Sequence, residues 1–470
     1  MDDTDGVNGR TSTGGLWRSG LDLLTVREQA TVMAEDDLVM KVAPETWKNF
    51  GMTVQRSPIS DLWSIRTSDI VGVAQLHVGE SRHHLRITPK IDGLDLIFLA
   101  DWAYGSSRSA LLLPGNRAFL AAIRDEPAAC LLGWYIDEML AFGKRWLRRG
   151  YELKREDLSS RIRGRVLVPQ YMQRSLARGR THVLPCEFTE PSQDTPVNRY
   201  LKTGLRHVAV LANSVPVLAA RTALSERARQ ALALFANVTD VPAVRQSRKR
   251  LNLNGPLRRY QGIVNLTQTL LDGMYVGTEH GQHSQGAIIW SLNSLYEEAL
   301  RGVLSNWQGA TLLRDAGRAS VKRSGTVLGS SSVKPDYIAS RSDGSTILLD
   351  AKYKDVGNQT SKAEDPGATV DIVVGKGPSI RVKRSDVYQV VAYAHHRKWQ
   401  ATKTSPTVAA LVFPVALASG EAYPSPAVIE GFDPSVHIVF FDVGPRANEN
   451  LNYLYAALDG IGPQVAGVAP

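Results

Sequence analysis

The chain has 470 residues, a formal net charge of +9 and 43% apolar residues. This length predicts two or three domains, and the apolar content is ordinary for a chain that builds hydrophobic cores. Its two cysteines, Cys130 and Cys186, are too few for a disulfide framework or a zinc site made of cysteines. The basic balance favours a polyanionic partner, and nucleic acid is the usual one.

The first residues predict neither a signal peptide nor a membrane anchor. The stretch MDDTDGVNGRTSTGG is acidic and rich in Gly and Thr, and it lacks the basic start and apolar run of a secretory signal. The longest apolar run, VAVLANSVPVLAA, is too short to span a bilayer. We therefore expect a cytoplasmic protein with no membrane segment and a disordered tail over residues 1–25.

Residues 26–115 are predicted to form a β-rich N-terminal domain. The alternating runs IVGVAQLHV and HHLRITPKI flank Gly79-Glu80-Ser81, which is the pattern of a β-hairpin. The stretch DLIFLADWAYG then turns helical.

Residues 116–270 predict a helical middle region with a basic linker. LLGWYIDEMLAFGKRWLRRG repeats its apolar residues at helical spacing. In DTPVNRYLKTGLRHVAVLA, Thr195 is the expected N-cap and Pro196 the first helical residue. SERARQALALFANV predicts a further helix, and RQSRKRLNLNGPLRRY reads as the linker.

Two groups of basic side chains lie in this middle region. Each is suited to bind a DNA backbone or an acidic partner. The alternatives are a solvated helix end for the first group and an ordinary charged linker for the second. The first group consists of Lys144, Arg145, Arg148, Arg149, Lys154, Arg155, Arg161, Arg163 and Arg165. The second group, the predicted DNA-binding set, consists of Arg245, Arg248, Lys249, Arg250, Arg258 and Arg259.

Residues 271–470 predict an α/β domain with a mixed central sheet flanked by helices. AIIWSLNSLYEEALRGVLSNW is expected to be one long amphipathic helix. KPDYIAS and STILLDAKY predict two strands around the turn Ser342-Asp343-Gly344. DVYQVVAYAHHRKW and NENLNYLYAAL predict helices, TVAALVFPV and VHIVFFDV buried strands, and the polar, Gly-rich residues 357–379 a loop.

The end of the second strand carries an acid and a lysine. Residues two apart in a strand point to the same face, so Asp350 and Lys352 emerge side by side. The hairpin brings Asp336 back toward Asp350. Two adjacent carboxylates repel unless a divalent cation lies between them, and Mg²⁺ prefers such ligands. With Lys352 to hold a water and stabilise charge on phosphorus, this set suits phosphodiester hydrolysis.

Each member of this set also has a plainer interpretation. Asp350 can form a structural ion pair with Lys352 or Lys354 at the strand end. Glu297, on the preceding predicted helix, is either a further carboxylate for the metal or part of a solvated helix face.

Gln389 lies among apolar residues of the following predicted helix, on one face with Tyr393. Because a polar group there needs a partner, Gln389 either reaches the site or is a satisfied core glutamine.

The order of these parts resembles the PD-(D/E)XK nuclease superfamily. The stretches LNSLYEEAL, VKPDYIAS, ILLDAKYK and DVYQVVAYA are similar to the McrC family, the nuclease subunit of modification-dependent restriction systems. Upstream, LRITPKIDGLDLIFLADWAYG, RIRGRVL, SQDTPVNRYLKTGLRHV and LNGPLRRY follow the order of the same family. The resemblance extends from about residue 70 to about residue 395.

The resemblance implies an α+β multidomain protein whose residues 271–470 form a PD-(D/E)XK endonuclease domain acting with Mg²⁺ or Mn²⁺. Asp336, Asp350 and Lys352 match the family's catalytic core. Glu297 matches its helix acid, a third metal ligand beside the two aspartates, and Gln389 its downstream glutamine.

The resemblance also implies partners. McrC-like chains cut double-stranded, methylated DNA together with a hexameric AAA+ GTPase of the McrB type, which docks on their N-terminal region and whose GTP hydrolysis they stimulate. The sequence contains no GxxxxGK[ST] motif, so a motor activity is expected on another chain. The alternatives are a repair or recombination nuclease of the same superfamily, a nuclease that acts on RNA, and a GTPase-activating or DNA-binding subunit that does not cleave.

Overall fold

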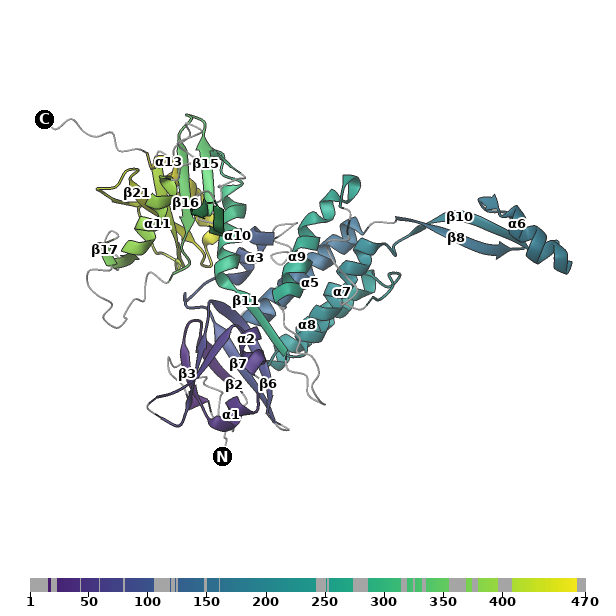
Figure 1. Cartoon of the computed structure of the whole chain (residues 1–470), viewed down its shortest axis with the longest axis horizontal. Coiled ribbons are helices and arrows are strands. Elements are labelled where there is room, and N and C mark those ends of the chain that lie inside the picture. The colour runs from purple at the N-terminus through teal and green to yellow at the C-terminus, as the bar shows by residue number, and fades with distance from the viewer. Residues whose placement is uncertain are drawn as a thin grey trace.

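The polypeptide runs from a β-rich base, through packed helices with a projecting arm, to a second sheet covered by helices (Figure 1). The computed structural model describes all residues except 1–15, 18–22, 43, 59, 79–80, 105–118, 120–122, 124–125, 148–149, 160, 242–250, 252, 274–285, 314–318, 324–325, 332–334, 355–368, 374–378, 396–407 and 463–470. The architecture is α+β with several sheets, as the sequence predicts. No helix among the described residues is long and apolar enough to cross a membrane.

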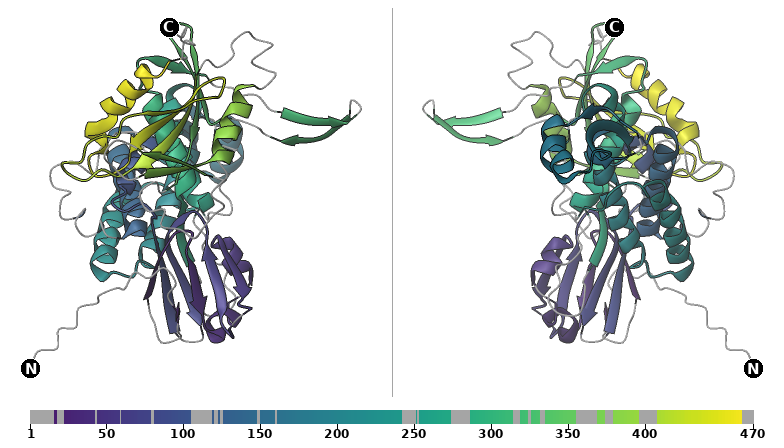
Figure 2. Two further views of the ribbon diagram at one scale, coloured as in Figure 1. Left: turned by 90° about the vertical axis from the view of Figure 1, so that its left-hand side faces the viewer. Right: turned by 90° about the vertical axis from the view of Figure 1, so that its right-hand side faces the viewer.

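Two four-stranded sheets form the base, which lies below the helices in both side views (Figure 2). The first has the order β1-β3-β5-β4, with β1 (Leu16–Trp17), β3 (Thr31–Ala34), β4 (Met52–Arg56) and β5 (Trp63–Thr67). The other sheet of the base has the order β11-β6-β7-β2, with β2 (Leu23–Arg27), β6 (Ile70–Val78), β7 (Ser81–Thr88) and β11 (Gly286–Ser291). The short helices α1 (Asp36–Met40) and α2 (Pro44–Asn49) complete the base.

The predicted hairpin of β6 and β7 is confirmed, since the two strands pair antiparallel from end to end. The prediction of a disordered tail over residues 1–25 was wrong where β1 and the start of β2 lie, because both strands join sheets of the base. The rest of that tail lies outside the described residues.

Strand β11 corrects the prediction of one long helix over AIIWSLNSLYEEALRGVLSNW. Its residues pair antiparallel with β6 of the base, far away in sequence. The chain then turns directly into α10 (Leu292–Leu304), where the Ser291 side chain caps the helix by accepting a hydrogen bond from the Ser294 N–H at 3.4 Å. Two adjacent isoleucines and a capping serine were the local signals for this switch from strand to helix.

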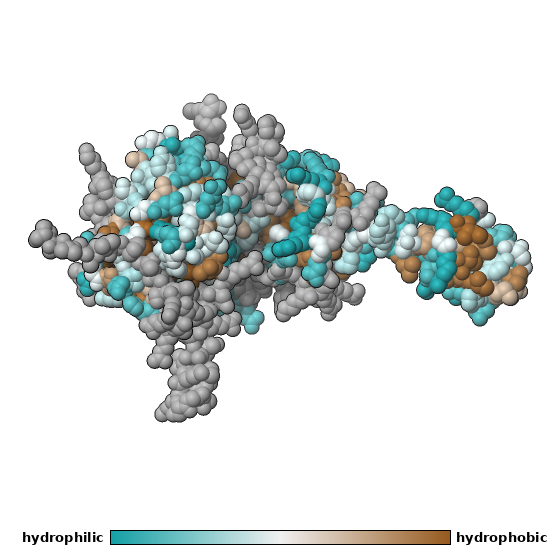
Figure 3. Space-filling view, turned by 90° about the horizontal axis from the view of Figure 1, so that it is seen from above, coloured by the Kyte–Doolittle hydropathy of each residue, from teal (hydrophilic) through white to brown (hydrophobic). Residues whose placement is uncertain are grey.

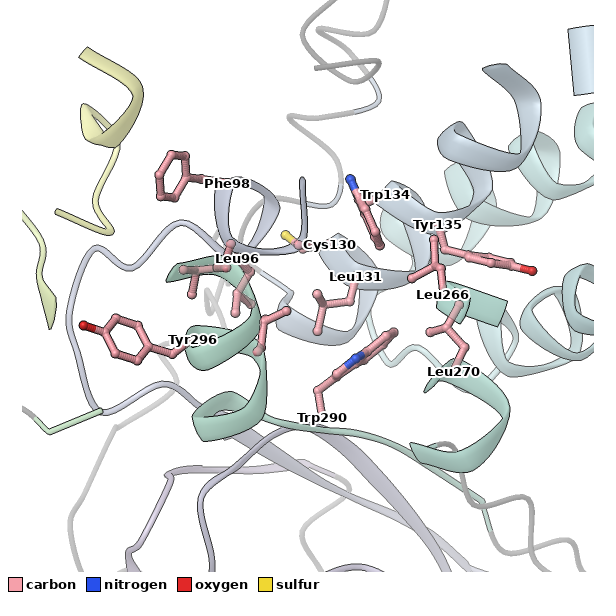
Figure 4. Packing of buried hydrophobic residues seen from close by; sticks show 14 of the residues in the cluster. Leu96, Phe98, Cys130, Leu131, Trp134, Tyr135, Leu266, Leu270, Trp290 and Tyr296 are labelled. Carbon is pink, nitrogen blue, oxygen red and sulfur yellow. The ribbon is translucent and has the colours of Figure 1, made fainter. Parts of the chain in front are cut away.

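The helical body consists of α3 (Leu96–Tyr104), α5 (Pro127–Trp146), α7 (Pro196–Ala212), α8 (Leu218–Leu234) and α9 (Gln261–Gly273). The predicted cap of α7 is confirmed, because the Thr195 hydroxyl accepts a hydrogen bond from the Asn198 N–H at 3.3 Å. Figure 4 shows Leu131 of α5, Leu266 of α9 and Trp290 of β11 in the same core. This core continues into the six-stranded sheet near the C-terminus, called the second sheet below. The base, the helices and that sheet are therefore packed as one unit.

The middle region also contains an arm that the sequence analysis did not predict. Its sheet has the order β8-β10-β9, with β8 (Gly150–Leu158), β9 (Arg165–Val166) and β10 (Leu184–Ser192). The short turns α6 (Val168–Gln170), η2 (Tyr171–Ser175) and η3 (Leu176–Arg178) form the far end (Figure 1). The expectation of a helical middle region over residues 116–270 was therefore wrong at β8, β9 and β10.

The arm explains part of the first basic group. Lys154 and Arg163 pair with Glu190, at 2.8 and 3.0 Å. Arg155 and Arg165 pair with Glu187 in the same way, at 2.7 and 3.1 Å. Two cations thus share each carboxylate across the arm, which offsets part of their charge and is the sheet counterpart of paired charges along a helix.

The second sheet, which lies outside the base, has six strands in the order β12-β15-β16-β19-β21-β20. They are β12 (Ala310–Leu312), β15 (Tyr337–Arg341), β16 (Thr346–Ala351), β19 (Val408–Val415), β20 (Ala427–Ile429) and β21 (Val436–Asp442). β15 and β16 form the predicted antiparallel hairpin, whereas β16, β19 and β21 run parallel. Helices α10 and α13 (Ala447–Gly460) cover one face and α11 (Arg384–Ala394) the other.

Two further hairpins and a 3₁₀ turn complete the described chain. The hairpins are β13 (Ala319–Arg323) with β14 (Thr326–Ser331), and β17 (Thr369–Val373) with β18 (Ser379–Lys383). The turn is η6 (Gly255–Tyr260). The predicted loop over residues 357–379 was wrong where β17 lies, and its remaining residues up to Pro378 are outside the described part.

Two glycines allow the base and α10 to approach their neighbours closely. Gly72 has a φ of +137°, and a Cβ there would lie 1.8 Å from the carbonyl oxygen of Ile288. A Cβ at Gly302 of α10 would lie 2.0 Å from the carbonyl oxygen of Trp102 in α3. Any side chain at either position would push backbone apart, so these glycines set how α10 is seated.

We predict that Gly302→Ala lowers the free energy of unfolding by about 1–3 kcal/mol, because the added methyl group overpacks the contact between α10 and α3. Thermal unfolding of wild type and variant measures the effect. Gly460→Ala is the matched control, since a Cβ there meets nothing within 4 Å. An unchanged unfolding temperature for Gly302→Ala would contradict the close approach.

Candidate functional site

The β15–β16 hairpin brings two carboxylates together, as its sequence predicts. Tyr337 pairs with Leu349, and continuing this antiparallel register places Asp336 opposite Asp350. The Ala351 N–H donates a hydrogen bond to Asp336 Oδ2 at 2.8 Å. Asp336 is therefore held against the end of β16.

The alternation of β16 decides which face carries the polar residues. Leu348 packs in the cluster that includes α11, while Leu349 packs in the core on the α10 side. Asp350 and Lys352 follow Leu348 at intervals of two and so lie on the α11 side. Lys352 Nζ is 2.5 Å from Asp350 Oδ2 and donates a hydrogen bond to Gln389 Oε1 at 2.9 Å.

Gln389 of α11 links Lys352 to a tyrosine. Its Nε2 donates a hydrogen bond to the Tyr393 hydroxyl oxygen at 2.6 Å, as their spacing of four predicts. Gln389 is exposed, so it is not a core glutamine, and its partner is the lysine at the strand end. In the first turn of the same helix, Asp386 forms an ion pair with Lys354.

Helix α10 presents Glu297 to the same place. Glu297 Oε1 accepts a hydrogen bond from Asn293 Nδ2 at 3.3 Å, and its carbonyl oxygen accepts one from the Tyr337 hydroxyl at 2.5 Å. The neighbouring Glu298 pairs with Arg301 instead, at 3.3 Å. Of the two adjacent glutamates, Glu297 is the one that lines the cavity.

All five predicted site residues line one cavity of about 380 Å³. Its wall is almost entirely polar and comes from the base as well as from the second sheet and its helices. The lining residues are Gln29, Asp69, Asn293, Glu297, Asp336, Asp350, Ala351, Lys352, Tyr353, Lys354, Asp386, Gln389 and Tyr393.

Three carboxyl groups of this cavity have pKa values shifted upward. Burial, and then the charge of Asp350, raises the pKa of Asp336 to about 7. Burial also raises the pKa of Asp350, although Lys352 opposes this shift. Burial, followed by the charges of Glu298 and Asp350, raises the pKa of Glu297. The cavity therefore holds more negative charge than its surroundings compensate.

Lys352 keeps its positive charge in this setting. Burial acts to lower the pKa of its ammonium group, but the nearby carboxylates, Asp350 first, outweigh it and raise the pKa. The side chain of Lys352 is 14% exposed. It is thus a charged donor held at the edge of a mostly buried acidic cavity.

The oxygen donors of the cavity fit a hard divalent cation. Within the described ranges, no group of three His, Cys, Asp or Glu side chains is already arranged to hold a metal ion. Asp336 and Asp350 are adjacent, and Glu297 faces the same space. This is the pattern expected for Mg²⁺, which takes one or two carboxylates and completes its shell with water and substrate phosphate oxygens.

The predicted DNA-binding set is only partly visible. Arg245, Arg248, Lys249 and Arg250 lie outside the described residues. Arg258 and Arg259 are exposed in η6, where the Arg259 guanidinium lies 4.4 Å from the ring centroid of Trp146. Neither of these two arginines lines the cavity.

Seven polar lining residues are not among the five predicted site residues: Gln29, Asp69, Asn293, Tyr353, Lys354, Asp386 and Tyr393. All but Gln29 and Asp69 had a usable signal, because each lies within four residues of a predicted site residue along the chain. Gln29 and Asp69 had none. They come from the base, and only the packing of the base against the second sheet brings them to the cavity.

Comparison with known families identifies the chain as a member of a restriction-system family. Residues 65–414 match the family described as McrBC 5-methylcytosine restriction system component, and the chain belongs to this family. The predicted resemblance is thereby confirmed. No curated protein matches the chain.

Two solved structures from Thermococcus gammatolerans are similar to it. One is the refined half-complex from a tetradecameric assembly of McrB AAA+ hexamers with bound McrC, matched at 17% identity and a TM-score of 0.52 over 93% of this chain and 99% of that chain. The other is the cryo-EM structure of the McrBC complex, at 17% identity and a TM-score of 0.40 over 60% and 87%. The first match shows a shared fold.

We predict that, with divalent cations removed, Asp336→Asn unfolds at a higher temperature than wild type at pH 8. The folded-state pKa of Asp336, about 7, lies above its ordinary value of 3.8. Folding therefore favours the protonated carboxyl, and the wild type loses stability as pH rises between those values.

At pH 5 the Asp336 carboxyl is mostly protonated in the folded state but ionised in the unfolded state, so the advantage of Asp336→Asn is present but clearly smaller than at pH 8. Thermal unfolding at both pH values in the presence of a chelator measures the difference. The exposed Asp61 provides a matched control, and Asp61→Asn leaves the unfolding temperature unchanged. A variant no more stable than wild type at pH 8 would contradict charge crowding at the cavity.

Proposed function

We propose that the chain is the nuclease subunit of a modification-dependent restriction complex. It hydrolyses phosphodiesters of double-stranded, methylated DNA when assembled with an AAA+ GTPase. The observation that carries this proposal is the convergence of Asp336, Asp350 and Lys352 in one cavity at the end of β16. This set resembles the PD-(D/E)XK site, and Glu297 and Gln389 join it from the two flanking helices.

Asp336 and Asp350 are the proposed ligands of Mg²⁺ or Mn²⁺, with Glu297 as a further ligand, directly or through water. When bound, the ion lowers the pKa of a water and stabilises charge on the phosphoryl group. The crowding that raises the pKa of Asp336 and Asp350 supports this assignment, because buried carboxylates that repel one another are suited to a shared cation.

Lys352 is the residue of this chain that brings a positive charge to the proposed reaction. Gln389 accepts a hydrogen bond from its ammonium group, and this contact fixes where the donor points. A cation held in that position stabilises negative charge that develops on a phosphoryl oxygen and orients the attacking water. Gln389 is therefore proposed as a positioning residue for Lys352.

Membership of the restriction family over residues 65–414 favours this function over DNA repair or recombination. A subunit that binds and stimulates a GTPase without cleaving remains the second candidate. The intact set of Asp336, Asp350 and Lys352 favours cleavage, and the experiment below separates the two.

We predict that the purified chain cleaves modified plasmid only with Mg²⁺, the neighbouring AAA+ GTPase and GTP. Asp350→Ala and Lys352→Ala each reduce the cleavage rate by about a hundredfold or more, because each removes charge at the reacting phosphate. Both variants still bind the partner and stimulate its GTP hydrolysis. Gel assays of plasmid cleavage and a phosphate-release assay measure the two activities.

Asp343→Ala is the matched control, because Asp343 lies in the turn of the same hairpin and is exposed. It cuts as wild type does. A chelator abolishes cutting, and Mn²⁺ restores it. If wild type stimulates GTP hydrolysis but never cuts, the non-cleaving subunit is the correct function. If Asp350→Ala cuts like wild type, the strand-end carboxylate is structural.

The arm is proposed as a contact surface for the GTPase partner. The family resemblance places partner contact in the N-terminal region, and the solved relative of similar fold is described as McrB AAA+ hexamers with bound McrC. On this chain the arm projects from the body and exposes large apolar side chains, which soluble surfaces usually avoid in groups. They are Tyr151, Leu153, Ile162, Val168, Met172 and Leu176.

Three of these side chains form a stripe at the far end of the arm. Val168, Met172 and Leu176 are spaced four residues apart along α6, η2 and η3 and are 58%, 53% and 42% exposed. Figure 3 shows apolar surface at this end of the molecule. An exposed apolar stripe on a projecting arm suits insertion into a groove or channel of another protein.

We predict that the double substitution Val168→Ser and Met172→Ser weakens binding to the GTPase partner by at least tenfold and reduces stimulation of GTP hydrolysis in parallel, since burial of two apolar side chains is lost. Co-sedimentation and GTPase assays measure both effects. Leu218→Ser, at an exposed position on α8, is the matched control and changes neither. Unaltered binding by the arm variant would exclude the arm tip as the contact.

A further inference from the structure

A tyrosine next to the proposed catalytic lysine is bound by the base of the molecule. The Tyr353 hydroxyl donates a hydrogen bond to Glu28 Oε1 at 2.7 Å, across a separation of 325 residues. Tyr353 directly follows Lys352 and is 4% exposed. The contact therefore joins the β-rich base to the last residues of β16, where the cavity lies.

Glu28 is a buried acid whose carboxylate accepts hydrogen bonds from both Tyr353 and Lys90. It is 3% exposed, and its Oε1 also accepts a hydrogen bond from the Lys90 N–H at 2.9 Å. Burial raises the pKa of Glu28, against the opposing attraction of Lys90. Oε2 accepts no hydrogen bond from any described residue. A buried carboxyl with so few donors depends strongly on each of them.

Lys90 and its neighbours hold the other side of the tyrosine. Lys90 Nζ lies 4.2 Å from the ring centroid of Tyr353 and 3.3 Å from Asp69 Oδ1. Gln29 donates a hydrogen bond to the same Asp69 carboxylate and has a φ of +59°, an unfavourable conformation for a residue other than glycine. Gln29 and Asp69 also line the cavity, so this part of the base reaches the site itself.

The same tyrosine is packed against the helix that carries Glu297. The rings of Tyr353 and Tyr296 lie 5.7 Å apart, and the Tyr296 hydroxyl donates a hydrogen bond to the Val412 carbonyl oxygen at 3.1 Å. That carbonyl also accepts a hydrogen bond from the Lys352 N–H at 2.9 Å. Tyr353 thus links the backbone of Lys352, helix α10 and the base.

Strand β11 adds a second rigid link. It pairs with β6 in the base and continues without a loop into α10. At this junction the Leu292 N–H donates a hydrogen bond to the Asp69 carbonyl oxygen at 3.2 Å. A shift of the base therefore moves both the helix that bears Glu297 and the strand end that bears Lys352.

We propose that Glu28, held by Lys90, is a positioning residue for cleavage: through the Tyr353 hydroxyl it sets the place of Lys352, and so makes the nuclease site depend on the β-rich base. This inference rests on the proposed function of the cavity. It also gives a route by which a partner bound to the N-terminal region controls cutting, because a change in the base reaches Lys352 through the buried hydrogen bond between Glu28 and Tyr353.

The test compares Tyr353→Phe, Glu28→Leu and their combination in the complete complex with partner, GTP and Mg²⁺. Each single variant lowers the maximal cutting rate by about tenfold, since a small misplacement of a reacting group is sufficient for such a loss. The concentration of DNA that gives half-maximal rate and the stimulation of GTP hydrolysis stay at wild-type values. Glu28→Gln, which keeps an acceptor oxygen, retains most of the rate.

The double variant separates positioning from a merely structural role. Tyr353→Phe alone leaves the Glu28 carboxyl without one donor and lowers the unfolding temperature, whereas Tyr353→Phe with Glu28→Leu removes both partners of this hydrogen bond and recovers part of the loss, since only the Lys90 N–H then lacks its acceptor. If Glu28 positions Lys352, the double variant is stable but still cuts about tenfold slowly. If its rate recovers with its stability, the contact is only structural and the proposal is overturned.

Tyr388→Phe is the matched control, because Tyr388 is 59% exposed on α11 and away from the cavity. It changes neither rate nor stability. Lys352→Ala and wild type show whether the cavity cuts at all. If wild type cuts and Lys352→Ala does not, but Tyr353→Phe cuts at the wild-type rate, this inference fails while the proposed function stands. If wild type never cuts, both fail.

Discussion

The repulsion between two carboxylates at the end of β16 is the constraint around which this molecule is organised. The hairpin register places Asp336 opposite Asp350 in a mostly buried cavity, where burial raises the pKa of both. A protein gains no stability from such a pair. The surrounding elements tolerate the pair and orient it. An amide N–H of β16 holds Asp336, Lys352 contacts Asp350, and Gln389 holds Lys352. Arrangements that oppose stability and yet are held firmly are typical of functional sites.

The site is composite because one core runs through the whole body. Apolar residues of the base, the helical body and the second sheet are in mutual contact, and a strand of the base continues directly into α10. Close backbone approach at Gly72 and Gly302 fixes that helix in place. The base then supplies Gln29 and Asp69 to the cavity wall and Glu28 to the tyrosine beside Lys352. A rigid connection of this kind lets an event on the base affect chemistry at the second sheet without a flexible linker between them.

The arm differs from the body, which is held by one continuous apolar core. Its strands are linked by ion pairs between half-buried carboxylates and more accessible cations, and it leaves large apolar side chains in water. Exposed ion pairs contribute little stability, so the arm's structure depends mainly on its backbone ladder. The chain belongs to a restriction-system family and shares its fold with a chain from a structure of McrB AAA+ hexamers with bound McrC. The cavity and the arm thus lie at separate places on one chain.

The sequence by itself determined the local features: the hairpin around Ser342-Asp343-Gly344, the cap at Thr195, the common face of Asp350 and Lys352, and the order of motifs that indicates the family. Each depends on residues close together in the chain, where spacing fixes geometry. Tertiary structure alone decided which strand AIIWS pairs with, that residues 150–192 form an arm, and that Glu28 touches Tyr353. These features rest on pairings between distant segments, such as β11 with β6, and no local pattern specifies which partner a strand or a buried acid will meet.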